Sequence, residues 1–70
     1  MQRVSGTNDP HNVLPKVGDA IRCARKDKGF SQEALADASL IDRSHLGRIE
    51  RGERNLTVLN LKKIADALEV

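Results

Sequence analysis

The sequence predicts an all-α fold of four or five short helices around one small core, and three observations carry this prediction. Apolar residues recur at helical spacing in several separate segments. Ser, Thr and Asp precede these segments and glycines follow them, as at the beginnings and ends of helices. Phe30 is the one aromatic residue among 70, so the core must be aliphatic, which suits short helices better than a sheet.

The first helix is expected over residues 15–28. Apolar residues follow Pro15 at helical spacing, and proline is tolerated in the first turn of a helix. Gly29 then stops the pattern. Residues 1–14 are polar and poor in apolar side chains, so we expect a flexible N-terminal arm there and one folded domain over residues 15–70.

Two further helices are expected in the middle of the chain, separated by a tight turn. Ser31 is a good N-cap for a helix over residues 32–38. Asp42 is a good N-cap for a second helix, which should end near Gly52. Because so few residues separate the two caps, the helices must cross steeply.

The second of these helices has an apolar side and a polar side. At about 100° per residue, Leu46 and Ile49 fall together and should face a core. The opposite side carries Arg43, Ser44, Gly47 and Arg48. Such a side suits a DNA major groove, where Arg binds guanine O6 and N7 and Ser bonds several base edges. An ordinary solvated helix face has the same composition, so geometry alone leaves both interpretations open.

The last helix is expected over residues 58–69. Thr57 is its N-cap, and it follows a polar loop that begins after Gly52. Its apolar residues form one stripe at helical spacing. The expected core of the domain is Val17, Ile21, Ala24, Leu35, Ile41, Leu46, Ile49, Leu61, Ile64 and Leu68, with Phe30 closing one end.

The charge pattern favours a polyanionic partner. The net charge is only +2, but the pI is about 9.0 and the cations gather at 22–28 and 43–54. Clustered cations displace counterions from phosphates even on a nearly neutral protein. The single cysteine excludes an internal disulfide, and no apolar run approaches the roughly 20 residues of a membrane span, so we expect a cytoplasmic protein.

Catalysis and metal binding find no support in the sequence. Asp42, Ser44 and His45 are the residue types of a hydrolase triad, but neighbouring helical side chains point about 100° apart and cannot act together. His11, His45 and Cys23 lack the paired spacing of a zinc site. We expect neither enzymatic activity nor a cofactor.

Residues 16–70 resemble the phage-repressor/Cro-type helix-turn-helix family, also called the XRE family. The resemblance is carried by Ile21, Arg22, Arg25, the runs 29–36 and 49–52, Leu61, the run 63–68 and Val70. It implies a lambda-repressor-like DNA-binding domain whose recognition helix, about residues 42–50, enters the major groove. The implied function is sequence-specific double-stranded DNA binding by a bacterial or phage transcriptional regulator, commonly a homodimer on a twofold operator.

The resemblance also implies roles for individual residues. Arg25 is expected to pair with Glu50 beneath the surface, although a loose surface pair is the simpler alternative. Gln32 is expected to meet the DNA backbone and brace Arg43. The implied base-reading residues are Arg43, Ser44 and Arg48, and the implied phosphate contacts are Gln32, Arg51, Arg54 and Asn55.

Leu40 departs from the family pattern, which usually has glycine where the turn needs a positive φ. A leucine there should cost roughly 1 kcal/mol in backbone strain. Either the turn bends differently or Leu40 offsets the strain by burying its side chain.

Two questions of function stay open on the sequence. Controller proteins of restriction-modification systems, phage repressors and antitoxins resemble the chain about equally, and the run 50–55 favours the first slightly. The same fold could also be a protein-interaction module that binds a partner such as a toxin, with an incidental basic face. A chain that stops directly after its last helix is expected to be either a short regulator or part of a longer protein.

Overall fold

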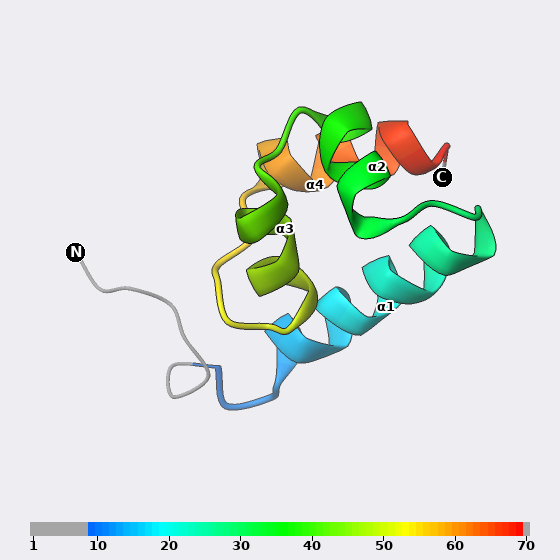
Figure 1. Cartoon of the computed structure of the whole chain (residues 1–70). Coiled ribbons are helices and arrows are strands. Elements are labelled where there is room, and N and C mark those ends of the chain that lie inside the picture. Colours follow the sequence, from blue (N-terminus) through cyan, green and yellow to red (C-terminus); the bar gives the residue numbers. More distant parts are fainter. Residues whose placement is uncertain (1–8, 70) are drawn as a thin grey trace.

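The computed structural model describes residues 9–69 and confirms the all-α fold, with no strand in that range. Its four helices pack around one aliphatic core, with α2 and α3 forming the helix-turn-helix pair (Figure 1). Residues 1–8, which belong to the expected N-terminal arm, lie outside the described part. The helices are α1 (Val13–Asp27), α2 (Gln32–Ser39), α3 (Arg43–Glu50) and α4 (Val58–Leu68).

The three N-caps expected from the sequence are present. Ser31 Oγ accepts the backbone N–H of Ala34 at 3.0 Å, at the start of α2. Thr57 Oγ1 accepts that of Asn60 at 3.0 Å, at the start of α4. Asp42 Oδ2 accepts the N–H groups of the second and third residues of α3. Each cap satisfies donors that have no partner within the helix, so these boundaries follow from local sequence.

Helix α1 begins at Val13, two residues earlier than expected and inside the segment assigned to the flexible arm. The cause is Asp9, which is 8% exposed and whose Oδ2 accepts the backbone N–H of Leu14 at 2.6 Å. Asn12, the residue before the helix, has a left-handed backbone with φ 55°. The carboxylate of Asp9, five residues before Leu14, therefore supplies the acceptor that the side chain of the N-cap residue would otherwise provide.

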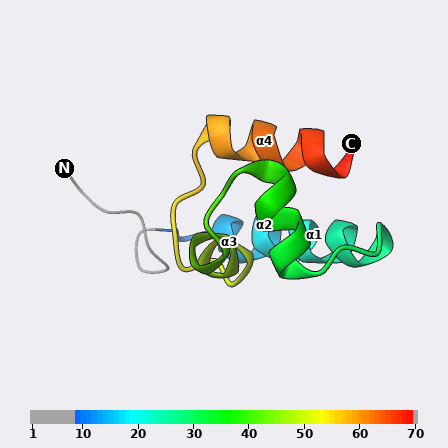
Figure 2. The same ribbon diagram turned by 45° about the horizontal axis from the view of Figure 1, so that its top comes forward.

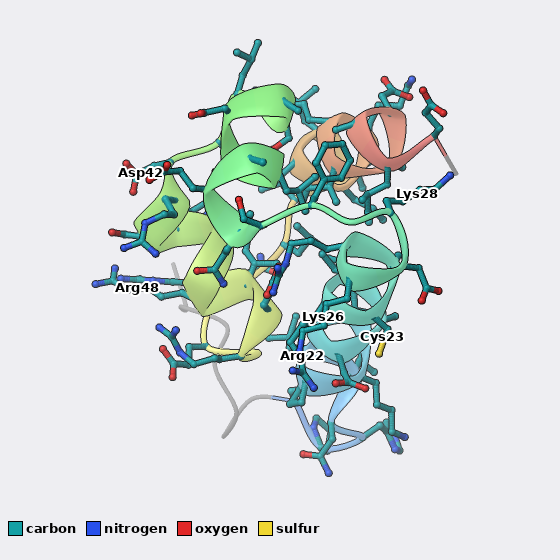
Figure 3. All side chains as sticks on the ribbon, turned by 45° about the vertical axis from the view of Figure 1, so that its right-hand side comes forward. Arg22, Cys23, Lys26, Lys28, Asp42 and Arg48 are labelled. Carbon is teal, nitrogen blue, oxygen red and sulfur yellow. The ribbon has the colours of Figure 1, made fainter. Side chains whose placement is uncertain are left out.

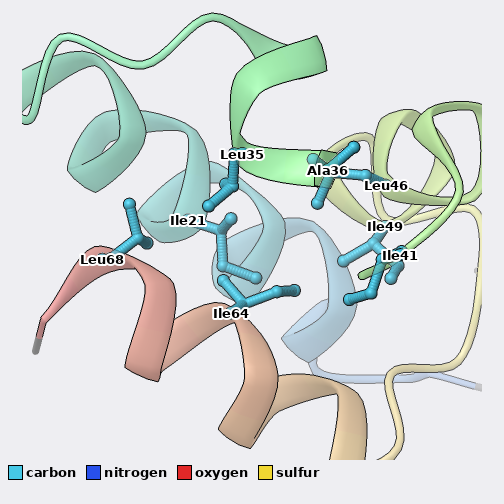
Figure 4. Close-up of a cluster of buried hydrophobic side chains, with 8 residues drawn as sticks. All are labelled: Ile21, Leu35, Ala36, Ile41, Leu46, Ile49, Ile64 and Leu68. Carbon is cyan, nitrogen blue, oxygen red and sulfur yellow. The ribbon is translucent and has the colours of Figure 1, made fainter. Parts of the chain in front are cut away.

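The core lies where the four helices meet, and most of its expected members are buried in it (Figure 4). Helix α2 packs against α4 and α3, while α1 packs mainly against α3. Figure 2 shows α4 on one side of the molecule and α1 and α3 on the other, with α2 between them. The buried residues are Ile21, Leu35, Ala36, Ile41, Leu46, Ile49, Ile64 and Leu68, with Val17, Ala24 and Phe30 partly buried against them.

The assignment of Leu61 to the core was wrong, because its side chain is 44% exposed. It lies on the rim of an apolar groove of about 330 Å³ between α1 and α4. Helix α4 turns Ile64 and Leu68 inward, and the opening towards α1 is not filled by the residues described. The apolar stripe of α4 is therefore wider than the surface that packs against it.

Helices α1 and α3 approach to backbone contact, and Gly18 makes this possible. A Cβ at Gly18 would overlap the carbonyl oxygens of Ile49 and Glu50 at the end of α3. Arg25 lies two turns further along α1 on the same side, so the crossing brings it towards Glu50. Gly52 has φ +75°, and a Cβ there would meet Pro15 Cα at 2.7 Å.

The turn between α2 and α3 keeps the left-handed conformation that the family pattern requires. Leu40 has φ 58° and ψ 38°, so the turn does not bend differently. Its side chain is 83% exposed, so burial does not offset the strain either, and both expected explanations were wrong. The leucine therefore carries the steric cost of this backbone conformation without a compensating contact inside the domain.

Replacing Leu40 with glycine is expected to stabilise the domain by about 0.5 kcal/mol. Glycine removes the clash at positive φ, and no buried contact is lost. The gain is smaller than the strain because glycine also makes the unfolded chain more flexible. Urea denaturation measures it, with Leu40→Ala as the control that keeps the Cβ and should change little. Equal stabilities of the glycine and alanine variants would show that the backbone is not strained.

Candidate nucleic-acid interface

The polar side of α3 faces solvent as the sequence predicted. Arg43, Ser44 and Arg48 are exposed, while Leu46 and Ile49 are 0% and 2% exposed in the core. Figure 3 shows Arg48 projecting from α3 away from the other helices. Both faces are set by the spacing of apolar residues in this short helix, because burying Leu46 and Ile49 turns the opposite side outward.

A shallow depression of about 230 Å³ runs along this exposed side. Gly47 forms its floor but is itself buried, because the side chains of Gln32 and Arg51 lie across it. These two side chains keep another surface from reaching the backbone at Gly47, although this small residue lies on the polar side of α3. The depression is lined by Gln32, Arg43, Ser44, Gly47, Arg48 and Arg51.

Gln32 connects the exposed side of α3 to the ion pair beneath it. Arg43 Nη1 donates to Gln32 Oε1 at 3.5 Å, which is the bracing contact expected from the family resemblance. Gln32 Nε2 donates to Glu50 Oε1 at 3.2 Å, so one of the two amide hydrogens proposed for a DNA phosphate already has an intramolecular acceptor. The amide is thereby held in one orientation at the start of α2.

Arg25 and Glu50 form a largely buried ion pair between α1 and the end of α3. Arg25 Nε donates to Glu50 Oε2 at 2.8 Å and its Nη2 donates to Glu50 Oε1 at 3.2 Å. The two side chains are 11% and 3% exposed, so the pair is not the loose surface contact that was the alternative. Arg25 also donates from Nη1 to the carbonyl of Phe30 at 3.1 Å. Arg25 is therefore unavailable to the basic cluster of α1 to which the sequence assigned it.

Arg51 is engaged by Glu53, a contact that sequence reasoning missed. Its Nε and Nη2 donate to the two carboxylate oxygens of Glu53 at 3.0 and 3.2 Å. This hydrogen-bonded pair raises the pKa of Arg51 above its usual value. The same hydrogen bonds lower the pKa of Glu53, with smaller contributions from the charges of Arg51, Arg48 and Arg54. The alternation of charges in residues 51–54 was the available signal.

The remaining predicted contacts lie in the loop that joins α3 to α4. Arg54 is partly buried and Asn55 is exposed. Arg54 lies close enough to Glu53 for its charge to lower the pKa of that carboxyl. The loop thus continues the basic surface beyond the end of α3.

The cations of α1 form a separate surface. Arg22 and Lys26 are exposed on α1, and Lys28 is exposed directly after its end (Figure 3). Arg22 Nη2 donates to Asp19 Oδ1 at 3.5 Å, and Cys23 is exposed beside it. None of these residues lines the depression on α3.

Residues 9–69 contain neither a cluster of metal-binding side chains nor a membrane-spanning helix. No three His, Cys, Asp or Glu side chains in that part of the chain gather where they could hold a metal ion. No helix there combines the length and apolar character needed to cross a membrane.

The chain is similar in sequence to a known protein family and to several of its members. The helix-turn-helix family model matches residues 21–70. The HTH-type transcriptional regulator SlrR of Bacillus subtilis is 46% identical over 55 residues, which are 77% of this chain and 36% of SlrR. Control protein C.MunI of a Mycoplasma species is 36% identical over 61 residues, which are 86% of this chain and 82% of that protein.

Solved structures agree in sequence and in shape. The crystal structure of the restriction-modification controller protein C.AhdI from Aeromonas hydrophila superposes with a TM-score of 0.80. The two chains are 47% identical, and the match covers 81% of this chain and 86% of C.AhdI. The chain therefore belongs to the helix-turn-helix family of DNA-binding transcriptional regulators of the phage-repressor/Cro (XRE) type.

Proposed function

We propose that this protein binds double-stranded DNA sequence-specifically, as a bacterial or phage transcriptional regulator, with α3 in the major groove. The observation that carries the proposal is the polar side of α3, where Arg43, Ser44 and Arg48 are all exposed to solvent. An α-helix fits the major groove, and these side chains can donate to base edges there. The buried Arg25–Glu50 pair beneath α3 gives the helix a fixed position.

The side chains of the interface divide into two groups by their position. Arg43, Ser44 and Arg48 lie on the helix itself and are proposed to contact base edges. Gln32, Arg51, Arg54 and Asn55 lie at the flanks, at the start of α2 and after α3, and are proposed to contact phosphates. Flanking contacts of this kind set the register of the helix in the groove, and the base contacts then supply specificity.

We also propose that two copies bind a twofold operator. The longest dimension of the domain is 32 Å, and half-sites in this binding mode lie about 34 Å apart, so one copy can occupy one half-site. Helix α4 offers an exposed apolar surface for the second copy, because Val58 and Leu59 are 85% and 64% exposed. Sedimentation with and without operator DNA should show a change from one copy to two. A protein that acts on DNA in this way is expected in the cytoplasm.

Among regulators of this family, we propose the controller type. Its support is the likeness to proteins named as restriction-modification controllers, at 44–47% identity for C.AhdI and C.Esp1396I. The operator is then expected beside restriction-modification genes. Neither a toxin-binding role nor a repressor role is favoured by a particular feature of the structure.

Selection of bound duplexes from a random DNA pool tests the proposed function. We expect enrichment of related sequences, bound at least tenfold more tightly than the starting pool. Affinity should fall steeply as salt rises, because phosphate contacts release counterions. A pool that enriches no duplex, or an affinity indifferent to salt, would contradict DNA reading and favour the protein-interaction module.

A further inference from the structure

Glu53 places a negative charge among the arginines of the proposed DNA interface. Its carboxylate receives two hydrogen bonds from Arg51, at 3.0 and 3.2 Å. Arg48 and Arg54 also lie near enough to act on it electrostatically. The Arg51 and Glu53 side chains are 59% and 55% exposed, so this pair stands in solvent where DNA would arrive.

The guanidinium of Arg51 is held at the edge of the depression on α3. Its Nη1 would lie 3.4 Å from a Cβ at Gly47, which places it on the exposed side of the helix. Nε and Nη2, the two donors that form a fork, are both taken by Glu53. A DNA phosphate offers two oxygens to the same fork, and Arg binds carboxylates and phosphates in the same two-point way. Glu53 therefore occupies one of the two-point edges that a phosphate could use and neutralises the charge of the guanidinium.

A paired arginine contributes little to the salt-dependent part of DNA binding. The Arg51–Glu53 pair has no net charge, so bringing it to a phosphate releases no additional counterion. If Arg51 turns to the phosphate, Glu53 is left facing the DNA backbone without its cation. If Arg51 stays with Glu53, a phosphate can bond only to its remaining N–H groups and meets no net positive charge. In both cases the carboxylate opposes binding at this point.

We propose that Glu53 acts as an intramolecular competitor for Arg51 and restrains sequence-independent binding to DNA. The proposal rests on the proposed function and adds a residue that determines how tightly the protein binds any duplex. The side chains of α3 that are proposed to read bases do not take part in the two hydrogen bonds between Arg51 and Glu53. Competition by Glu53 therefore lowers the affinity for selected and for random DNA by similar factors. Glu53 is thus a positioning residue that acts through Arg51.

The test is the slope of log affinity against log salt for a random duplex, measured with the full chain. Glu53→Gln should make this slope steeper by about one and raise affinity roughly 5- to 10-fold at 0.1 M salt, because one more cation then faces the phosphates. Arg51→Gln should make it shallower by about one, because Glu53 is then uncompensated. The double variant, neutral at both positions, should return close to the wild-type slope.

Asp66→Asn is the matched control. It changes the net charge by the same amount and breaks another exposed pair, between Lys62 Nζ and Asp66 Oδ2 at 2.8 Å, on α4. Its slope should stay close to wild type, and thermal unfolding should show all the variants folded. A Glu53→Gln slope equal to wild type, or equal to that of Asp66→Asn, would overturn the competitor role while DNA binding itself stands. A protein that binds no duplex would overturn both proposals.

Discussion

Replacing Glu50 with alanine should destabilise the domain by about 3 kcal/mol or more. The change leaves the Arg25 side chain, 11% exposed, without its counter-charge at the junction of α1 and α3. It also removes the acceptor of the Gln32 amide. A domain of this size has on the order of 5 kcal/mol of total stability, so the variant should keep only about 2 kcal/mol and unfold at a much lower urea concentration than the wild type. Urea denaturation followed by circular dichroism measures the loss.

Two further variants separate the buried charge from the loss of a contact. Asp66→Ala breaks the exposed pair on α4 and should cost less than about 1 kcal/mol, since solvent screens that pair. Arg25→Met combined with Glu50→Leu removes both buried charges and should recover most of the loss, because apolar residues of similar volume often replace such pairs. A double variant as unstable as Glu50→Ala would show that packing, not an unpaired charge, causes the effect.

Features of the fold that depend on neighbouring residues could be predicted from the sequence. The caps at Ser31, Asp42 and Thr57 act on backbone groups within three residues, and they appear as expected. The start of α1 could not be predicted in this way, because Asp9 reaches past the polar segment to Leu14. Acceptors that act from outside the helix leave no periodic signal.

The predictions for the burial of Leu61 and for the turn at Leu40 were wrong for another reason. Periodicity tells which side of α4 is apolar but not how much of that side its neighbours cover, so Leu61 was wrongly placed in the core. At Leu40 the backbone keeps φ 58° although the side chain is 83% exposed. The positions of the neighbouring helices impose this turn, and local side-chain preference does not decide it.

The sequence predicted which side chains of α3 face outward, but it did not predict the contact that Arg51 makes just after this helix. Arg43 and Arg48 face outward because a helix with a buried side must have an exposed one. Arg51 lies just beyond α3, where helical geometry no longer determines direction, and its fork to Glu53 depends on the loop. For this reason Arg51 could be predicted as a phosphate contact but not as the partner of Glu53.

Arg43→Ala and Arg54→Ala should weaken DNA binding in different ways. Arg43 lies on α3 and is braced by Gln32, so losing it should cost about 1–3 kcal/mol on the selected sequence and little on random DNA. Arg54 lies in the loop after α3, where a phosphate contact is independent of sequence. Losing it should weaken all duplexes alike and lower the salt slope by about one. Titration of both duplexes at several salt concentrations measures the four affinities.

Lys62→Ala is the control for charge alone, because Lys62 is exposed on α4 and paired with Asp66. It removes one cation, as the two arginine variants do, but should leave both affinities nearly unchanged. The contrast between the arginines depends on where they stand, since base edges are reached only from the helix inside the groove and phosphates from its flanks. If Arg43→Ala weakened random and selected DNA equally, α3 would be a phosphate-binding surface and specificity would have to come from elsewhere in the chain.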